Sequence, residues 1–89
     1  MLFRSLRGQE VLNELRQALA ARDPHGLKSA AHAIKGTART LGFNALGQIA
    51  ERLEHQAATA TPEALAAWIE EAEGAFVAAR LFLLKVPSG

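Results

Sequence analysis

The residues with the clearest chemical potential lie in one short segment, where a histidine is surrounded by cations. If the segment is a helix with about 100° per residue, His32 lies about 140° from the centre of the apolar stripe that begins at Leu27. The imidazole then projects into solvent, with Lys28, Lys35 and Arg39 around it. Nearby positive charge favours the neutral, nucleophilic ring and can afterwards neutralise the oxygens of a phosphoryl group. The segment therefore predicts a surface histidine that carries a phosphoryl group.

Gly36 lies one turn beyond His32, in the interior of the same predicted helix. Glycine at such a position costs about 1 kcal/mol relative to alanine, so something should compensate for it. Without a side chain at position 36, a second macromolecule can bring its surface down onto the imidazole. Lys35 is the best placed cation, because it lies at i+3 from His32 on the same side of the helix. The alternative is an ordinary solvated basic face with an incidental histidine, and Gly36 favours the reactive site.

The composition indicates one small folded domain. The 89 residues are 49% hydrophobic and 21% charged, which is ordinary globular usage. A net charge of +1 is too balanced for the broad basic surface that binds nucleic acid, so nucleic acid is not expected as a partner. The absence of cysteine excludes disulfides and Cys-ligated metal sites. No apolar run approaches the roughly 18 residues of a membrane span, so membrane insertion is not expected.

Residues that favour helix boundaries divide the chain into segments. Asp23-Pro24 and Thr61-Pro62 each place a side-chain oxygen at a predicted N-cap and a proline at the first helical position. Gly42 suits a left-handed C-terminal cap, and Asn44 can cap the helix that follows. One helix is therefore expected to end, and the next to begin, within about three residues.

Between these boundaries the apolar residues recur at helical spacing in four stripes. The stripes are Val11, Leu12, Leu15, Ala18 and Leu19; Leu27, Ala31, Ile34, Ala38 and Leu41; Leu46, Ile49, Ala50, Leu53 and Ala57; and Leu65, Trp68, Ile69, Ala72, Phe76, Ala79 and Leu83. Because each stripe must be buried, we predict an all-α fold, an antiparallel up-and-down four-helix bundle with a short N-terminal helical segment. The segment is set off by a bend at Gly8. Residues 1–89 are expected to form this single domain, with a helical hairpin over residues 24–58.

The largest side chains of the last helix are expected to serve packing. Trp68 lies in register with Phe76 and Leu83, and the three are predicted to fill much of the core. The apolar residues of segment 81–86 exceed one stripe. They either contact the apolar residues of segment 2–6 or offer an apolar patch to a partner.

The segment from His32 to Leu46, HAIKGTARTLGFNAL, followed by Leu53-Glu54, strongly resembles the histidine-containing phosphotransfer (HPt) domain of bacterial multistep phosphorelays. The close match covers residues 27–54, and the flanking helices agree in length and pattern. Thr37 departs from the family, which usually has a smaller residue there. The resemblance implies a four-helix bundle that accepts a phosphoryl group from the aspartyl phosphate of a response-regulator receiver domain and passes it to another receiver.

The resemblance also implies a role for each residue of the site. His32 is the phosphoacceptor, with Nε2 as the nucleophile, and Lys35 pairs with the phosphoryl oxygens. Glu54 hydrogen-bonds the imidazole from the neighbouring helix, and a bond to Nδ1–H would fix the tautomer; the alternative for Glu54 is a solvated surface carboxylate. Contacts with the receiver are expected at Lys28, Ala33, Gly36, Arg39 and Thr40.

The chain is expected to carry phosphate without being an enzyme. It has no Gly-rich phosphate loop, no nucleotide-binding motif and no acidic cluster for Mg²⁺, so no cofactor is expected and the partner must supply the magnesium ion. The implied partners are receiver domains and a hybrid sensor histidine kinase. We expect a cytoplasmic monomer, either free-standing or a fragment at the cytoplasmic end of a membrane-bound sensor kinase.

Three other interpretations remain open at this point. The resemblance extends to the phosphoacceptor domain of chemotaxis kinases, which takes phosphate from an ATP-bound kinase domain. A helical interaction module that moves no phosphate has the same pattern. A mixed metal site is the third, although the nearby cations would repel a bound dication; it would draw on His25, His32, Glu51, Glu54 and His55.

Overall fold

The chain folds into four helices and the turns between them. A computed structural model describes the backbone of residues 2–85 and the side chains of residues 10–81. The helices are α1 (Leu2–Ala20), α2 (Pro24–Leu41), α3 (Asn44–Gln56) and α4 (Pro62–Lys85), and no strand occurs within residues 2–85. The predicted all-α class is therefore confirmed. None of these helices is long and apolar enough to cross a membrane.

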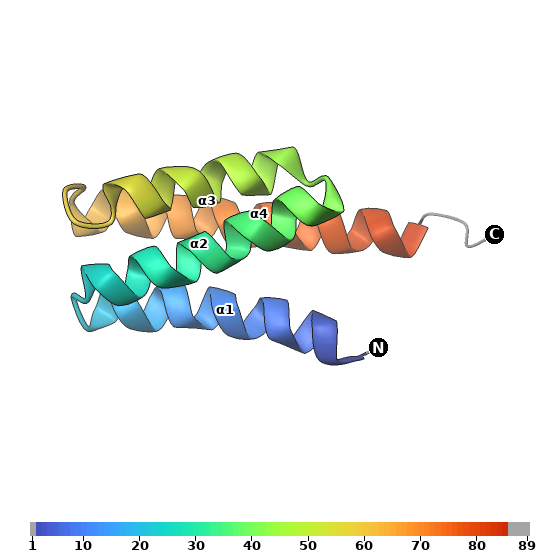
Figure 1. Ribbon diagram of the computed structural model, residues 1–89, viewed down its shortest axis with the longest axis horizontal. Helices are drawn as coiled ribbons and strands as arrows, with labels where there is room; N and C mark the ends of the chain where they lie inside the picture. The colour runs from blue at the N-terminus through green and yellow to red at the C-terminus, as the bar shows by residue number, and fades with distance from the viewer. Residues whose placement is uncertain (1, 86–89) are drawn as a thin grey trace.

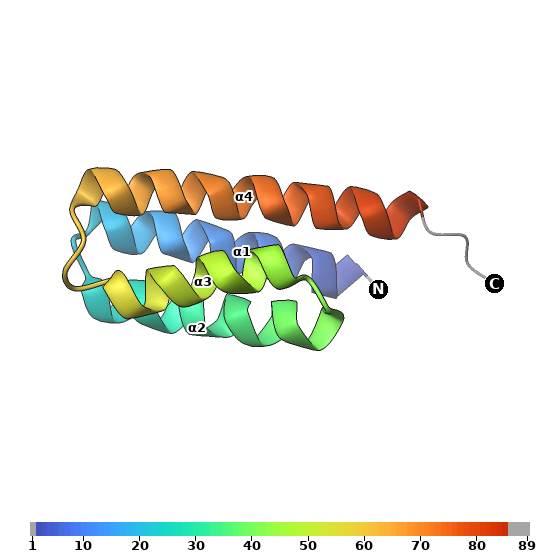
Figure 2. The same ribbon diagram turned by 90° about the horizontal axis from the view of Figure 1, so that it is seen from above.

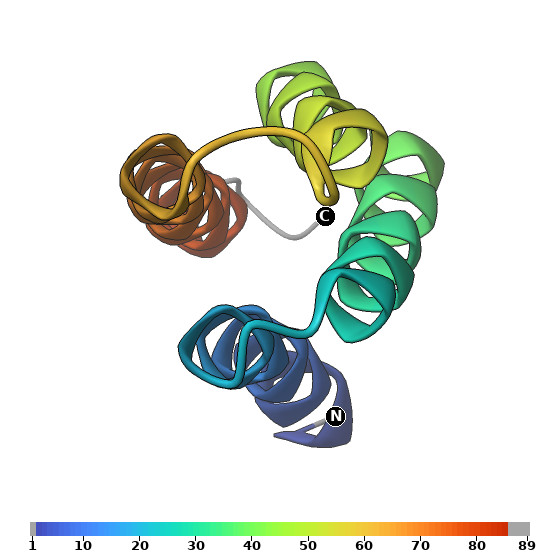
Figure 3. The ribbon, with the colours of Figure 1, turned by 90° about the vertical axis from the view of Figure 1, so that its left-hand side faces the viewer.

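The four helices surround a common centre when the molecule is viewed end on (Figure 3). Each helix packs against its neighbour in sequence, and α4 packs against α1 to close the ring. The α1–α2 and α3–α4 connections lie at one end of the molecule and the α2–α3 connection at the other (Figure 1). α4 is the longest helix and continues past the α2–α3 connection (Figure 2).

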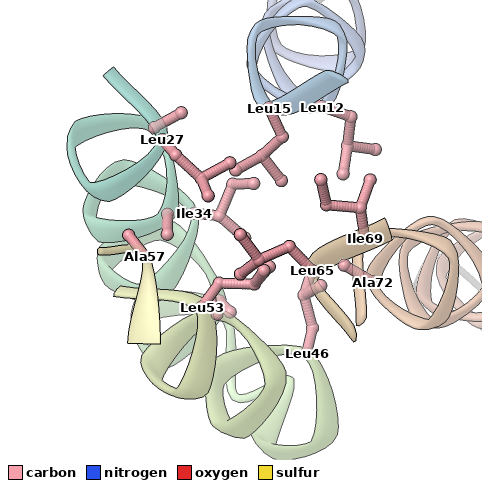
Figure 4. Close-up of a cluster of buried hydrophobic side chains, with 14 residues drawn as sticks. Leu12, Leu15, Leu27, Ile34, Leu46, Leu53, Ala57, Leu65, Ile69 and Ala72 are labelled. Carbon is pink, nitrogen blue, oxygen red and sulfur yellow. The ribbon is translucent and has the colours of Figure 1, made fainter. Parts of the chain in front are cut away.

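The core consists of aliphatic side chains from all four helices (Figure 4). Its buried members are Leu12, Leu15, Leu27, Ala30, Ala31, Ile34, Ala38, Leu46, Ala50, Leu53, Ala57, Leu65, Ile69 and Ala72. These residues follow the four predicted stripes, with Ala30 added. Trp68 and Phe76 are only partly buried at the margin of the core, so the prediction that they fill much of its volume is wrong. Leu83, the third predicted member, lies outside the residues whose side chains are described.

Two helix starts form as local chemistry predicts. The Asp23 carboxylate accepts a hydrogen bond from the Gly26 amide at 3.1 Å, and α2 begins at Pro24. The Thr61 hydroxyl oxygen accepts one from the Ala64 amide at 3.1 Å, directly before α4. Both side chains satisfy an amide of the first helical turn that has no partner within its own helix.

The turn between α2 and α3 follows the prediction only in part. Gly42 has φ +81° and caps α2 in the left-handed conformation, as expected. Asn44 is not a cap, because it is already the first residue of α3; Phe43 takes the N-cap position without a side-chain hydrogen bond and packs on the core. Leu41 is 56% exposed, although its spacing placed it in the core, because it is the last residue of α2.

Gly8 does not interrupt the first helix, so the predicted separate N-terminal segment is wrong. α1 runs without a break from Leu2 to Ala20. A single glycine lowers helix propensity but keeps its N–H and C=O, so the hydrogen-bond ladder can continue through it. The side chains of segment 2–6 and of residues 82–86 lie outside the described part, while Leu81 is 52% exposed. The two alternatives for these apolar residues therefore stay open.

Polar side chains join α4 to both of its neighbours. The Arg16 guanidinium of α1 makes two hydrogen bonds of 2.5 Å to the Glu73 carboxylate. On the other side, Arg52 of α3 lies over the Trp68 ring at 5.5 Å from its centroid. These contacts fix α4 against the helices that position the site.

Candidate functional site

His32 lies on the outer side of α2, next to α3. Its side chain is 69% exposed, whereas its helical neighbours Ala31 and Ile34 are buried in the core. The ring nitrogen Nδ1 lies 2.9 Å from Oε2 of Glu54 on α3. The structure therefore brings together the exposed imidazole and the carboxylate that the resemblance paired with it.

Glu54 also contacts Lys35. Its second oxygen, Oε1, lies 2.6 Å from Nζ of Lys35, and the two side chains are only 13% and 18% exposed. The hydrogen bond from Lys35 is the main reason that the pKa of Glu54 is below its usual value of 4.5. Burial acts in the opposite direction, and the hydrogen bond with His32 adds to the lowering. Glu54 is therefore a carboxylate, with one oxygen on each of the two α2 side chains.

The charge of Glu54 determines which tautomer of His32 suits this arrangement. An ionised carboxylate can only accept hydrogen bonds, so Nδ1 must donate and carry the proton. In the neutral ring Nε2 then holds a free electron pair. Because the ring is mostly exposed, this pair is accessible to a group that approaches from solvent.

Arg39 makes a second ion pair between the two helices. Its Nη2 lies 2.5 Å from Oε1 of Glu51 on α3. Glu51 is also approached by His55 of its own helix, with 3.8 Å between Nε2 and Oε2. The side chains of Arg39 and Glu51 are 58% and 44% exposed, so this pair is more accessible to solvent than the pair between Lys35 and Glu54.

The surface beside His32 is open at Gly36. A Cβ atom added at this position would meet nothing within 4 Å. The Thr40 hydroxyl donates a hydrogen bond of 2.9 Å to the Gly36 carbonyl and is thus held along α2. Ala33 is exposed as well. No contact within the described chain therefore requires a glycine at position 36, which leaves room there for another molecule.

Lys28 differs from the other two cations on this side of α2. It lies one turn before His32 and is exposed. Among residues 10–81, no carboxylate lies within 4.0 Å of its ammonium group. The three cations that the sequence grouped together are therefore unequal, since Lys35 and Arg39 are each bound to a carboxylate of α3 and Lys28 is not.

The partners of Lys35 and Arg39 were not predicted from the sequence. Glu51 was considered as a metal ligand, and Glu54 as a partner of His32, a solvated carboxylate or a metal ligand, but neither was expected to pair with a cation. A signal was present in the chain, because His32 lies eleven residues before Phe43 and Glu54 lies eleven after it. In a helical hairpin that turns at Phe43, such residues face each other, and neighbouring charges can then be paired across it.

The alternative of a metal site gains no support from this geometry. Within the described side chains, no group of three His, Asp or Glu residues is arranged to hold a metal ion. Glu54 and Glu51, the carboxylates that such a site would need, are bound to Lys35 and Arg39 instead.

Comparison with known proteins adds independent information on the family. Searches of curated proteins and of solved structures found no match to the chain. The family model of the Hpt domain, in contrast, matches residues 7–78, which is well over half of the 89 residues and includes α2, α3 and the whole cluster around His32. The chain therefore belongs to the Hpt domain family, whose members act in histidine phosphotransfer.

Proposed function

We propose that the chain is a phosphorelay intermediate in two-component signal transduction, built as a single antiparallel up-and-down four-helix bundle. Hpt domains are phosphocarrier modules that interact with receiver domains and kinases. The observation that carries the proposal is the exposed His32 whose Nδ1 is occupied by Glu54, which leaves Nε2 for phosphate. His32 would take its phosphoryl group from one receiver and pass it to another.

The transfer requires only one nucleophilic atom from this chain. The electron pair of His32 Nε2 attacks the phosphorus of the aspartyl phosphate, and the bond between phosphorus and the aspartyl oxygen breaks. The receiver keeps a free carboxylate, and the imidazole becomes a phosphorylated imidazolium with its proton still on Nδ1. Glu54 stabilises this positive ring, because its negative charge lies 2.9 Å from Nδ1. The reverse step passes the group to the next receiver.

Lys35 and the partner complete the proposed chemistry. Lys35 would stabilise the phosphoryl oxygens with the donors of its ammonium group that Glu54 does not occupy, since an ammonium group has three. The receiver or kinase domain supplies the magnesium ion and the group to be transferred, so the chain acts as a carrier rather than as an enzyme.

We further propose that the receiver docks on α2 around the open position at Gly36. Lys28, Ala33, Arg39 and Thr40 would line this contact, and each of them is exposed. A relay intermediate must release its partner, so a small interface with micromolar affinity is expected. We place the reaction in the cytoplasm, with a hybrid sensor histidine kinase as one partner and with the chain as a monomer.

The decisive experiment is phosphoryl transfer from a panel of phosphorylated receivers to wild type and to His32→Gln. We expect label on the wild type and none on the variant, with His25→Gln as a control that keeps the wild-type rate. Label on His32→Gln, or none on the wild type with every receiver, would contradict the proposal. ATP and Mg²⁺ without a partner should leave the wild type unlabelled, whereas self-phosphorylation would show that it is not a simple carrier.

A further inference from the structure

The charged side chains between α2 and α3 are balanced at one end of this row and unbalanced at the other. Lys35 pairs with Glu54 at 2.6 Å and Arg39 with Glu51 at 2.5 Å, so one carboxylate matches each of these cations. Lys28 is exposed, and among residues 10–81 no carboxylate lies within 4.0 Å of its ammonium group. The net positive charge of the row is therefore located at Lys28.

The register of the helical hairpin explains why Lys28 has no carboxylate partner there. Lys28 lies seven residues, almost two full turns, before Lys35, so both lysines lie on the side of α2 where Lys35 reaches α3. Ala58 lies as far after Phe43 as Lys28 lies before it, and segment 55–60 contains no aspartate or glutamate. The lack of a partner on this side thus follows from the sequence and does not depend on one side-chain conformation.

The groups around Lys28 do not cancel its charge. Arg22 and Asp23, in the turn before α2, offset each other, and the Asp23 carboxylate caps the helix through the Gly26 amide. A single charge acts over a Debye length of about 10 Å at 0.1 M salt, whereas a close ion pair has no net charge to act at that distance. Lys35 and Arg39 keep donors for hydrogen bonds. Lys28 is the α2 cation whose charge attracts a partner before contact.

Lys28 and Gly36 lie on opposite sides of His32 along α2. Each is one turn from the histidine, about 6 Å along the helix axis. The surface at Gly36 is open, since an added Cβ would meet nothing within 4 Å. A protein that covers His32 therefore meets open surface in one direction and an uncompensated positive charge in the other. Only one of the two orientations along α2 places an acidic edge of the partner at Lys28.

From this arrangement we infer that Lys28 is a specificity-determining residue, which meets a carboxylate on the receiver surface, separate from the reactive aspartate, and so sets the orientation of the receiver along α2. The inference rests on the proposed function and deepens it, because it assigns the charge attraction of docking to one residue. The partner that fits is a receiver with an acidic residue at one edge of its docking face.

The test uses the receiver that labels the wild type fastest. The Kd of its unphosphorylated form and the kcat/KM of its phosphorylated form are measured with Lys28→Gln at about 0.1 M and about 1 M salt, where the Debye length is about 10 Å and about 3 Å. Arg80→Gln is the matched control, because Arg80 is an exposed cation of α4 without a carboxylate within 4.0 Å among residues 10–81. Arg39→Gln/Glu51→Gln removes a balanced pair.

At about 0.1 M salt, we expect Lys28→Gln to raise the Kd and to lower kcat/KM about two- to fivefold, the effect of one exposed charge pair. Both differences from the wild type should largely disappear at about 1 M salt. Arg80→Gln should match the wild type at both salt concentrations. Loss of affinity in Arg39→Gln/Glu51→Gln should be the same at both, because this change removes no net charge.

An effect of Lys28→Gln on the phosphorylated receiver alone would overturn the inference, since Lys28 would then act on the phosphoryl group. A loss that persists at about 1 M salt, or an equal loss in Arg80→Gln, would overturn it as well. If no receiver labels the wild type, the proposed function fails and the inference fails with it. If transfer occurs and Lys28→Gln binds the receiver like the wild type, only the inference fails.

Discussion

At the scale of single residues, the two nitrogens of His32 have different surroundings because one carboxylate occupies one of them. Glu54 accepts from Nδ1 at 2.9 Å and contacts Lys35 at 2.6 Å. The ionised state that this double contact requires is favoured, since the hydrogen bond from Lys35 lowers the pKa of Glu54. The tautomer of the ring and the charge of the carboxylate therefore depend on each other.

Replacement of Glu54 should loosen the tautomer and slow transfer. In Glu54→Ala, His32 loses its acceptor, so part of the population should move its proton from Nδ1 to Nε2, as ¹⁵N NMR of the ring can measure. We expect transfer from a receiver to slow about five- to tenfold, which corresponds to about 1 kcal/mol, the net contribution of a typical hydrogen bond. Glu51→Ala is the matched control, because Glu51 lies one turn earlier on α3 and contacts Arg39 instead. An unchanged tautomer in Glu54→Ala would remove the orienting role.

The sequence was sufficient to predict that Glu54 and His32 meet, but it was not sufficient for the partner of Lys35. The first contact was implied by the resemblance of the segment to Hpt domains, and the structure shows it at 2.9 Å. A lysine has a long stem, and its ammonium group can reach several positions on a helix surface. The spacing about Phe43 places Glu54 opposite this part of α2, but which nearby group the ammonium contacts depends on where the carboxylate oxygen lies in space.

At the scale of the helices, Gly36 is a position where a larger side chain would have opposite effects on the stability of the fold and on the docking of a receiver. The position is open, with nothing within 4 Å of an added Cβ, so a side chain there meets no resistance from the chain itself. Gly36→Leu should raise the free energy of unfolding by up to about 1 kcal/mol, because leucine has the higher helix propensity. The same change should raise the KM for a phosphorylated receiver at least tenfold, since it fills the approach to His32. Urea unfolding and transfer kinetics measure the two effects.

Gly74 provides the control for this prediction. It lies in the interior of α4, and an added Cβ would again meet nothing within 4 Å. Gly74→Leu should therefore stabilise the protein to a similar degree without a change in KM. If both variants weaken the receiver interaction equally, the effect at Gly36 does not come from docking on α2.

The helix boundaries show which kind of sequence information is reliable. Asp23, Thr61 and Gly42 were predicted correctly, because a cap depends on the residue itself and on its immediate neighbours. Gly8 and Asn44 were predicted wrongly for the opposite reason. A glycine permits a bend and an asparagine permits a cap, but the continuation of α1 and the packing of Phe43 on the core decided the outcome.

At the scale of the whole molecule, the site depends on two helices that contribute no reactive residue to it. α2 and α3 supply the reactive residues, while α1 and α4 cover their apolar faces and contact each other. The core is made of leucine, isoleucine and alanine, and no polar or charged side chain is buried among residues 10–81. The charged contacts at its edge, such as Arg16 with Glu73, therefore hold the helices together from the surface.

The pair between Arg16 and Glu73 should make stability fall in acid. The hydrogen bond from Arg16 lowers the pKa of Glu73 below its usual 4.5, against the effect of burial. A lowered pKa in the folded state means that the contribution of the ion pair to stability is present above about pH 4.5 and is lost as the pH falls through the lowered value.

At pH 7, Glu73→Gln should reduce the free energy of unfolding by at most about 1 kcal/mol, because Arg16 is half exposed. As the pH falls through the lowered pKa of Glu73, the difference from the wild type should shrink towards zero, since protonated glutamate resembles glutamine. Urea unfolding monitored by circular dichroism at pH 7 and at acid pH measures the difference in the free energy of unfolding. Glu14→Gln is the control, because Glu14 is an exposed α1 carboxylate without an ion pair among residues 10–81. A difference that persists unchanged in acid would show that Glu73 stabilises the bundle by packing rather than by its charge.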